Sequence, residues 1–153
     1  MNILFICMGN ICRSPLLEGW AAHRRADSPV AFSVDSAGTG GWHAGQPPDP
    51  RAIAAARRRG IDISGQRARQ LQYADFQAFD LVLCADRDNL AAARSLAPVS
   101  ARPRIVLALE WCGVKQGGEV PDPYYGHDRD FDHVCQLASE AADGLLRRLA
   151  SGA

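Results

Sequence analysis

Short apolar runs alternate with helical segments along the chain, and this alternation restricts the folds that it can adopt. The apolar runs, each of strand length, cover residues 2–7, 30–34, 80–84 and 104–108. Segments with helical patterns or helix-start signals follow them, at residues 14–26, 49–60, 86–96 and 130–149. Strands that are separated by helices form a parallel sheet with helices on both faces. The sequence therefore predicts an α/β domain in three layers.

The segments that follow the predicted strands are expected to form a binding site. Parallel sheets bind ligands at the carboxyl ends of their strands, where the strand order changes direction. The segments after Cys7, Val34, Cys84 and the fourth strand should therefore converge. The other predicted loops and turns are residues 36–50, 113–121 and 122–126.

Length and charge limit the class of protein. The chain has 153 residues, of which 47% are hydrophobic and 22% charged, as expected for a single globular domain over residues 1–153. Its formal net charge is zero, whereas a general affinity for nucleic acid or an anionic membrane needs excess positive charge. We therefore expect no nucleic-acid partner. No basic leader follows Met1 and no stretch is apolar enough to span a bilayer, so we expect no membrane insertion and a cytoplasmic location.

The cysteine pattern indicates free thiols. The five cysteines form an odd set without the dense spacing of a disulfide framework, which suits a reducing cytoplasm. The sequence has no Cys-x-x-Cys pair and its histidines are scattered, so a zinc site is not expected. We expect neither a metal nor a cofactor.

The segment from Cys7 to Pro15, Cys-Met-Gly-Asn-Ile-Cys-Arg-Ser-Pro, joins a predicted strand to a predicted helix. Backbone N–H groups of a tight loop at a helix N-terminus can surround an anion. Gly9 and Asn10 are residue types that adopt the positive φ angles such a loop needs. Arg13 can bind two phosphate oxygens with its planar guanidinium. The Gly-Lys-Ser/Thr ending of nucleotide-binding loops is absent, so the sequence favours a phosphate site other than one for ATP or GTP.

Cys7 is the predicted nucleophile of this site. A thiol that faces N–H donors, Arg13 and a helix terminus loses its proton readily, and the Ser14 hydroxyl can stabilise the thiolate further. A thiolate beneath a bound phosphate needs no general base for attack. The alternative is that Cys7 simply ends a buried strand. The sequence Arg13-Ser14-Pro15 that follows favours the catalytic interpretation.

Phosphoryl transfer also needs a proton for the departing oxygen, and Asp122 is the predicted donor. Asp35, Asp86 and Asp128 are the other aspartates considered at loop positions. Asp122 is preferred because the following proline restricts its backbone and helps to define the turn. Tyr124 and Tyr125 can form the walls of a slot for an aromatic substrate. The alternative is that Asp-Pro-Tyr-Tyr-Gly forms a plain surface turn.

Together, residues 7–15 and 122–126 resemble the low-molecular-weight protein tyrosine phosphatases. The Trp42 loop, Asp49-Pro50-Arg51-Ala52 and Ala68-Arg69-Gln70 are similar to the pattern of that family, so the resemblance covers essentially the whole chain. It implies a four-stranded parallel sheet flanked by helices, and hydrolysis of phosphotyrosine monoesters in two steps.

The resemblance also implies a role for each site residue. Cys7 attacks phosphorus to form a cysteinyl-phosphate while Asp122 protonates the phenolate, and water activated by the ionised Asp122 then releases phosphate. Arg13 stabilises the equatorial oxygens throughout. Asp86 has a supporting role, although an ordinary helix N-cap is an equal interpretation. The implied substrate-binding residues are Met8, Gly9, Asn10, Ile11, Cys12, Ser14, Trp42, Tyr124 and Tyr125.

Two of these residues have open alternatives. Cys12 matches the second loop cysteine of the family, which can form a reversible disulfide that protects Cys7 from irreversible oxidation. The alternative is that Cys12 is a small core residue. Trp42 is expected as an aromatic wall at the entrance, with anchoring of its loop in the core as the alternative.

Other functions of the same fold compete with this prediction. Arginine phosphatases share the loop but generally carry a threonine at the position of Ile11, and the apolar Ile11 favours phosphotyrosine. Thiol-dependent arsenate reductases need resolving cysteines, and Cys84 has no closely spaced partner. A phosphate-binding module without catalysis would not need both Cys7 and Asp122. The resemblance implies a phosphotyrosine protein as substrate, and a tyrosine autokinase is a candidate.

Overall fold

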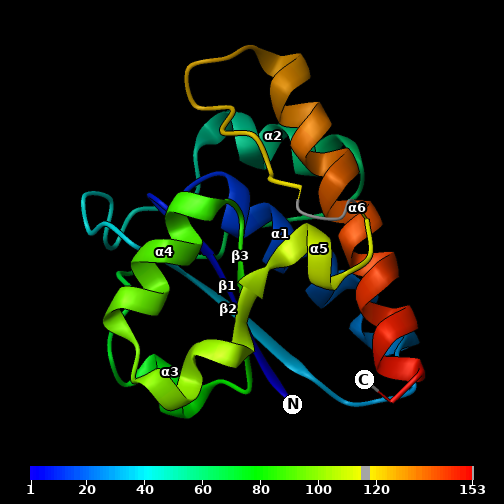
Figure 1. Cartoon of the computed structure of the whole chain (residues 1–153). Helices are drawn as coiled ribbons and strands as arrows, with labels where there is room; N and C mark the ends of the chain where they lie inside the picture. The colour runs from blue at the N-terminus through cyan, green and yellow to red at the C-terminus, as the bar shows by residue number, and fades with distance from the viewer. Residues whose placement is uncertain (115–117, 153) are drawn as a thin grey trace.

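One parallel sheet of four strands forms the centre of the molecule (Figure 1). The structure is a computed structural model that describes residues 1–114 and 118–152. The strands lie in the order β2-β1-β3-β4. Their bounds are Asn2–Cys7 for β1, Ser33–Gly38 for β2, Leu81–Cys84 for β3 and Ile105–Leu107 for β4. This arrangement confirms the predicted fold class.

Both faces of the sheet are covered because the side chains of β1 alternate between two cores. Ile3, Phe5 and Cys7 belong to the larger core, whereas Leu4 and Ile6 belong to the smaller one. The larger core also contains residues of α1 (Arg13–Arg24), α2 (Pro50–Arg58), α5 (Ala108–Trp111) and α6 (Asp128–Ala150). The smaller core contains residues of α3 (Asp75–Ala78) and α4 (Arg87–Leu96). Two short 3₁₀ helices cover Arg25–Asp27 and Val99–Arg104.

The last predicted helix, at residues 130–149, is confirmed as α6, and one face of it is buried and largely apolar. Its buried members are Phe131, Val134, Ala138, Ala141, Leu145 and Leu149. Gly144 allows a close approach to the preceding segment, because a Cβ atom at this position would lie 1.8 Å from the carbonyl oxygen of Cys112. The helix α6 therefore packs against α5 nearly backbone to backbone.

The second strand lies further along the chain than predicted. The sequence indicated residues 30–34, but β2 covers Ser33–Gly38 and pairs from Asn2↔Ser33 to Cys7↔Gly38. Val30 is exposed, and the buried half of β2 consists of Ser36, Ala37 and Gly38, which form no apolar run. The predicted loop at 36–50 is therefore wrong at its start, because residues 36–38 belong to β2. The predicted loop at 113–121 is irregular where it is described, and residues 115–117 lie outside the described residues.

The strand order changes direction at β1. Because β2 lies on one side of β1 and β3 on the other, the chain that leaves β1 does so at the point where ligands of parallel sheets bind. Gly38 lets the end of β2 approach this point closely, since a Cβ there would lie 2.7 Å from the carbonyl oxygen of Met8. The backbone N–H of Thr39 donates to the carbonyl of Cys7 (2.9 Å).

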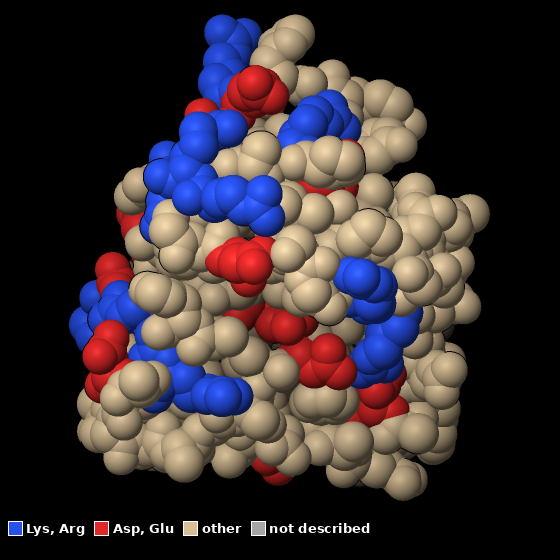
Figure 2. Space-filling model, turned by 180° about the vertical axis from the view of Figure 1, so that it is seen from behind, with Lys and Arg blue, Asp and Glu red and all other residues tan. Residues whose placement is uncertain are grey.

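Charges of both signs are interspersed on the surface. Figure 2 shows basic and acidic side chains next to one another on the face opposite to the view of Figure 1. Within residues 1–114 and 118–152, none of the helices has the length and apolar character needed to cross a membrane.

Candidate active site

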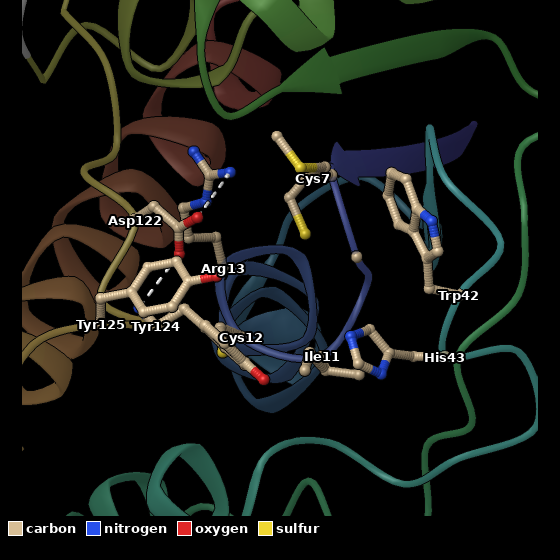
Figure 3. Close-up of a pocket in the computed structure, with 11 residues that line it drawn as sticks. Cys7, Ile11, Cys12, Arg13, Trp42, His43, Asp122, Tyr124 and Tyr125 are labelled. Carbon is tan, nitrogen blue, oxygen red and sulfur yellow. Dashed lines mark hydrogen bonds and ion pairs between the residues drawn. The ribbon is translucent and has the colours of Figure 1, made fainter.

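A cavity of about 220 Å³ opens at the carboxyl end of β1. Cys7 is only 2% exposed, whereas Tyr125 is 94% exposed. Figure 3 shows Trp42 and His43 on one side of Cys7, with Asp122, Tyr124 and Tyr125 on the opposite side. The lining residues are Cys7, Met8, Gly9, Ile11, Cys12, Arg13, Trp42, His43, Asp122, Tyr124 and Tyr125. Most of the predicted site residues therefore meet in one cavity.

Asn10 determines the shape of the loop between β1 and α1. It adopts a φ of 58°, and its backbone N–H donates to Cys7 Sγ (3.3 Å). Gly9, which was expected to share this conformation, has no positive φ. Asparagine tolerates the left-handed region better than most residues because its short amide can form local hydrogen bonds. Asn10 is 2% exposed and lies behind the cavity wall.

The side chain of Asn10 holds the loop to neighbouring segments. The backbone N–H of Arg69 donates to Asn10 Oδ1 (3.0 Å), which fixes the orientation of the amide. Asn10 Nδ2 then donates to Ser14 Oγ (2.8 Å) and to Ser36 Oγ (2.9 Å). Both amide hydrogens are used, and each serine hydroxyl acts as an acceptor.

These bonds orient the hydroxyl of Ser14 toward the sulfur. Ser14 is fully buried, and its Oγ lies 3.0 Å from Cys7 Sγ. If the thiol were the donor, the buried Ser14 proton would lose this acceptor, and an unsatisfied buried donor costs about 1–3 kcal/mol. We therefore assign Ser14 as the donor and the sulfur as the acceptor, a role that suits a thiolate.

Arg13 places a cation next to this sulfur. The side chain is 3% exposed, and its Nη1 donates to Asp86 Oδ2 (2.6 Å) and to the carbonyl of Val120 (3.1 Å). Burial lowers the pKa of Arg13, but the neighbouring Cys7 and Asp86 raise it, and the net effect is an increase. Arg13 is therefore a permanent positive charge at the inner end of the cavity.

Asp86 contacts Arg13 and is also the N-cap of α4. Its Oδ2 accepts from Arg13, while its Oδ1 accepts from the backbone N–H of Asn89 (2.7 Å) as the N-cap of α4. The N-cap fixes the carboxylate at the end of β3, and the carboxylate in turn orients the guanidinium. Asp86 does not line the cavity, and it supports Arg13 from outside.

Asp122 reaches the cavity from the segment before α6. Its Oδ1 accepts from the backbone N–H of Tyr124 (3.1 Å), and its Oδ2 lies 3.8 Å from Arg13 Nη2. The Asp122 side chain is 47% exposed, so a carboxyl group here can exchange protons with water. The rings of Tyr124 and Tyr125 pack edge to face, with centroids 4.9 Å apart.

The opposite wall contains one residue that the sequence did not reveal. Trp42 is 71% exposed and lines the cavity, so the alternative that it anchors its loop in the core is wrong. His43 also lines the cavity, and its Nδ1 lies 3.0 Å from Gln46 Oε1. The sequence feature that could have identified His43 as a site residue is its position next to Trp42 in the predicted loop at 36–50.

Cys12 is both a buried residue and part of the cavity wall. It is 4% exposed, and burial together with the negative charges of Asp49, Cys7 and Asp122 raises the pKa of its thiol far above the ordinary value. Cys7 and Cys12 are free thiols in this structure. The reversible disulfide between them stays a prediction.

A metal centre is not apparent in the part of the chain that the structure describes, where no three His, Cys, Asp or Glu side chains group as metal ligands. A buried sulfur acceptor, a fixed guanidinium and an exposed carboxyl group face one small cavity. This set can bind an anion, attack it and supply a proton to a leaving group.

Known proteins of similar sequence include several that are described as protein tyrosine phosphatases. The family model for low molecular weight phosphotyrosine protein phosphatase matches residues 2–152. The chain is 37% identical over 150 residues to the low molecular weight protein-tyrosine-phosphatase YfkJ of Bacillus subtilis, covering 95% of this chain and 94% of that protein. Its identity to the human low molecular weight phosphotyrosine protein phosphatase is 39% over 151 residues, covering 96% and 94%. A protein tyrosine phosphatase from Entamoeba histolytica, crystallised with Hepes in its active site, has a TM-score of 0.93 at 32% identity, covering 99% of this chain and 98% of that one.

Proposed function

The chain belongs to the low-molecular-weight phosphotyrosine protein phosphatase family, and from this premise we propose that it hydrolyses phosphotyrosine through a phosphate ester of Cys7. The observation that carries the proposal is the contact between Ser14 Oγ and Cys7 Sγ (3.0 Å) beside the buried Arg13. It favours an ionised sulfur at the inner end of a cavity that also contains a carboxyl group.

In the first step, the Cys7 thiolate attacks phosphorus. A bond forms between sulfur and phosphorus, and the bond between phosphorus and the phenolic oxygen breaks. Arg13 Nη1 is already engaged by Asp86 and Val120, so the edge formed by Nε and Nη2 is the one suited to bind two phosphate oxygens. Asp122 gives its proton to the departing phenolate, a contribution of about 10²–10⁴ in rate.

In the second step, water replaces the cysteine. The ionised Asp122 accepts a proton from water, and the water oxygen attacks phosphorus. The bond between sulfur and phosphorus breaks, which regenerates the thiolate and releases inorganic phosphate. Ser14 donates to the sulfur as it leaves with its negative charge, so this hydrogen bond stabilises the departing thiolate.

The shape of the cavity supports an aromatic phosphate ester as substrate. The sulfur is buried, while Trp42 and Tyr125 are exposed at the entrance, so the phosphate must enter on a side chain long enough to pass between aromatic walls. A phosphotyrosine ring meets both requirements, because it is rigid and packs favourably against other aromatic rings. The short side chain of phosphoserine meets neither.

Two related activities, hydrolysis of phosphoarginine and reduction of arsenate, are the alternatives. Ile11 lines the cavity and presents no hydroxyl to a guanidinium, which argues against phosphoarginine. Arsenate reduction needs a relay of resolving thiols. Cys12 lines the cavity, but Cys84 is fully buried outside it and cannot continue such a relay. The finer proposals of a cytoplasmic location and of a tyrosine autokinase as substrate rest on the resemblance described above.

The proposal is tested by assaying phosphotyrosine, phosphoarginine and arsenate with the wild type, Cys7→Ser and Asp122→Asn. We expect turnover of phosphotyrosine that Cys7→Ser abolishes. Asp122→Asn should lose about 10²–10⁴ in rate on phosphotyrosine and less on aryl phosphates with better leaving groups. Cys135→Ser, a buried thiol on α6, is the matched control and should retain activity. Phosphotyrosine activity that survives Cys7→Ser refutes the mechanism.

A further inference from the structure

We propose that Arg51 is a positioning residue for the proton donor, because it ties the segment that carries Asp122 to the phosphate-binding loop. This inference rests on the proposed function, in which Asp122 protonates the leaving group. The structure connects four residues in series, each to the next: Ile11, Asp49, Arg51 and Tyr124.

The segment around Asp122 is held from outside on both sides. Before Asp122, the backbone N–H of Val120 donates to the carbonyl of Ala85 (2.8 Å), and the carbonyl of Val120 accepts from Arg13 (3.1 Å). After Asp122, Arg51 Nη2 donates to the carbonyl of Tyr124 (2.9 Å). Arg13 thus binds a backbone carbonyl before Asp122, and Arg51 binds one after it.

Aromatic contacts reinforce the bond from Arg51. Its guanidinium carbon lies 5.6 Å from the centroid of the Tyr124 ring and 4.6 Å from that of the Phe131 ring. Phe131 is fully buried in the first turns of α6, so it provides a fixed surface for the guanidinium. Stacking of this kind is typical of arginine and contributes about 0.5–2 kcal/mol.

Asp49 fixes the other edge of the same guanidinium. Its carboxylate accepts from Arg51 Nε (3.1 Å) and Nη2 (2.9 Å), and its Oδ1 also caps the N-terminus of α2. Burial raises the pKa of Asp49. The hydrogen bonds from Arg51 lower this pKa by more than burial raises it, so the net effect is a decrease. A carboxylate that is 8% exposed thus orients Arg51 permanently.

Asp49 in turn contacts the phosphate-binding loop directly. Its backbone N–H donates to the carbonyl of Ile11 (2.8 Å). Asp49 and Arg51, at the start of α2, therefore link the loop between β1 and α1 to the segment that carries Asp122. Movement of Tyr124 away from the cavity has to break the bond to Arg51.

This linkage matters because few other contacts from the described residues fix the Asp122 carboxyl group. Its side chain is 47% exposed, it accepts from a neighbour within its own turn, and it lies 3.8 Å from Arg13. Its position relative to the phenolic oxygen thus depends on the backbone. A misplacement of about 1 Å can cost roughly 10²-fold in rate.

The kinetic test compares Arg51→Gln with the wild type on aryl phosphates of poor and good leaving groups. The measured quantity is kcat/KM, which reports the steps up to departure of the phenolate. We expect a loss of about tenfold for the poor leaving group and less than about threefold for the good one. In the Asp122→Asn background, Arg51→Gln should cause no further loss. Equal losses for both leaving groups, or the same loss in the Asp122→Asn background, overturn the proposal.

Two controls separate this role from a structural one. Arg58 lies on the same helix as Arg51, and Arg58→Gln breaks its ion pair to Asp132 of α6 (2.9 Å). This variant should leave the turnover of both substrates unaffected. Thermal unfolding of Arg51→Gln and of Arg51→Lys, which keeps the charge without the fork, shows whether each variant is folded at the assay temperature. If a variant is folded at the assay temperature and its kcat/KM is still reduced, the reduction results from a change in the active site and not from unfolding.

Hydrogen exchange provides a readout that does not depend on activity. The amide of Gly126, which donates to the carbonyl of Pro123 (2.8 Å), reports the order of the turn. Exchange there should be about fivefold faster in Arg51→Gln and unchanged in Arg58→Gln. Unchanged exchange in Arg51→Gln overturns the linkage even if the enzyme is active. Activity that survives Cys7→Ser instead refutes the proposed function, while the exchange still decides whether Arg51 orders the turn.

Discussion

Replacing Glu18 by glutamine removes a carboxyl group that the fold holds at an energetic cost. Glu18 lies in α1, and its Oε1 accepts from the hydroxyl of Ser36 in β2 (2.6 Å). Burial raises the pKa of Glu18 from its ordinary value of 4.5 to about 7. The Ser36 hydrogen bond opposes this increase, Asp35 adds to it, and Arg69 opposes it. Glutamine has the same shape, keeps an oxygen for Ser36 and carries no charge.

The direction in which the free energy of unfolding changes with pH follows from proton binding to Glu18. Between pH 4.5 and about 7, the folded chain holds a proton on Glu18 that the unfolded chain has lost, so the free energy of unfolding falls as the pH rises. The decrease is complete above about pH 7. Each tenfold change in proton affinity corresponds to about 1.36 kcal/mol, so a rise from 4.5 to about 7 corresponds to about 3 kcal/mol.

Urea unfolding at pH 5 and pH 8 measures this contribution. The stability of Glu18→Gln relative to the wild type should increase by about 2–3 kcal/mol between the two pH values. Glu140→Gln, at an exposed position of α6, is the matched control and should show no such change. A difference between Glu18→Gln and the wild type that stays constant with pH would show that this carboxyl group is not strained by burial.

Further predictions concern glycines at close contacts and use the same unfolding assay. Gly144→Ala places a Cβ 1.8 Å from the carbonyl oxygen of Cys112 and should cost about 1–3 kcal/mol. Gly65→Ala, where a Cβ meets nothing within 4 Å, should change stability by less than about 0.5 kcal/mol, and a similar loss in both would contradict the packing argument. Gly40→Ala places a Cβ 1.8 Å from the ring of Trp42, which is exposed and can move. We expect a KM for phosphotyrosine raised about threefold with little change in stability, and an unchanged KM would exclude Trp42 from substrate binding.

The loop between β1 and α1 was predictable because its determinants are local. Cys7, Arg13 and Ser14 lie within one strand-to-helix connection. The residue types favoured a positive φ at both Gly9 and Asn10, and the structure has it at Asn10 alone of these two. The N-caps of α2 and α4 follow equally from short patterns, because an N-cap binds an amide within the next turn. The role of Asp122 came from the resemblance and from the proline that follows it.

The second strand was misplaced because its residues contain little information about burial. Ser36 is buried through hydrogen bonds to Asn10 and Glu18, and these partners are distant in sequence. A polar residue that is buried in this way does not contribute to an apolar pattern. Pairing with β1 determined where the strand lies.

The amino-acid sequence by itself determined the α/β class and the residues that the loop between β1 and α1 brings together, because these depend on local patterns and on contacts within a few residues. Only the tertiary structure decided which distant groups support that loop. Arg69 fixes the amide of Asn10, and Arg51 connects Asp49 to Tyr124. Such contacts depend on the relative positions of whole helices and strands, and those positions result from the packing of two cores around the sheet.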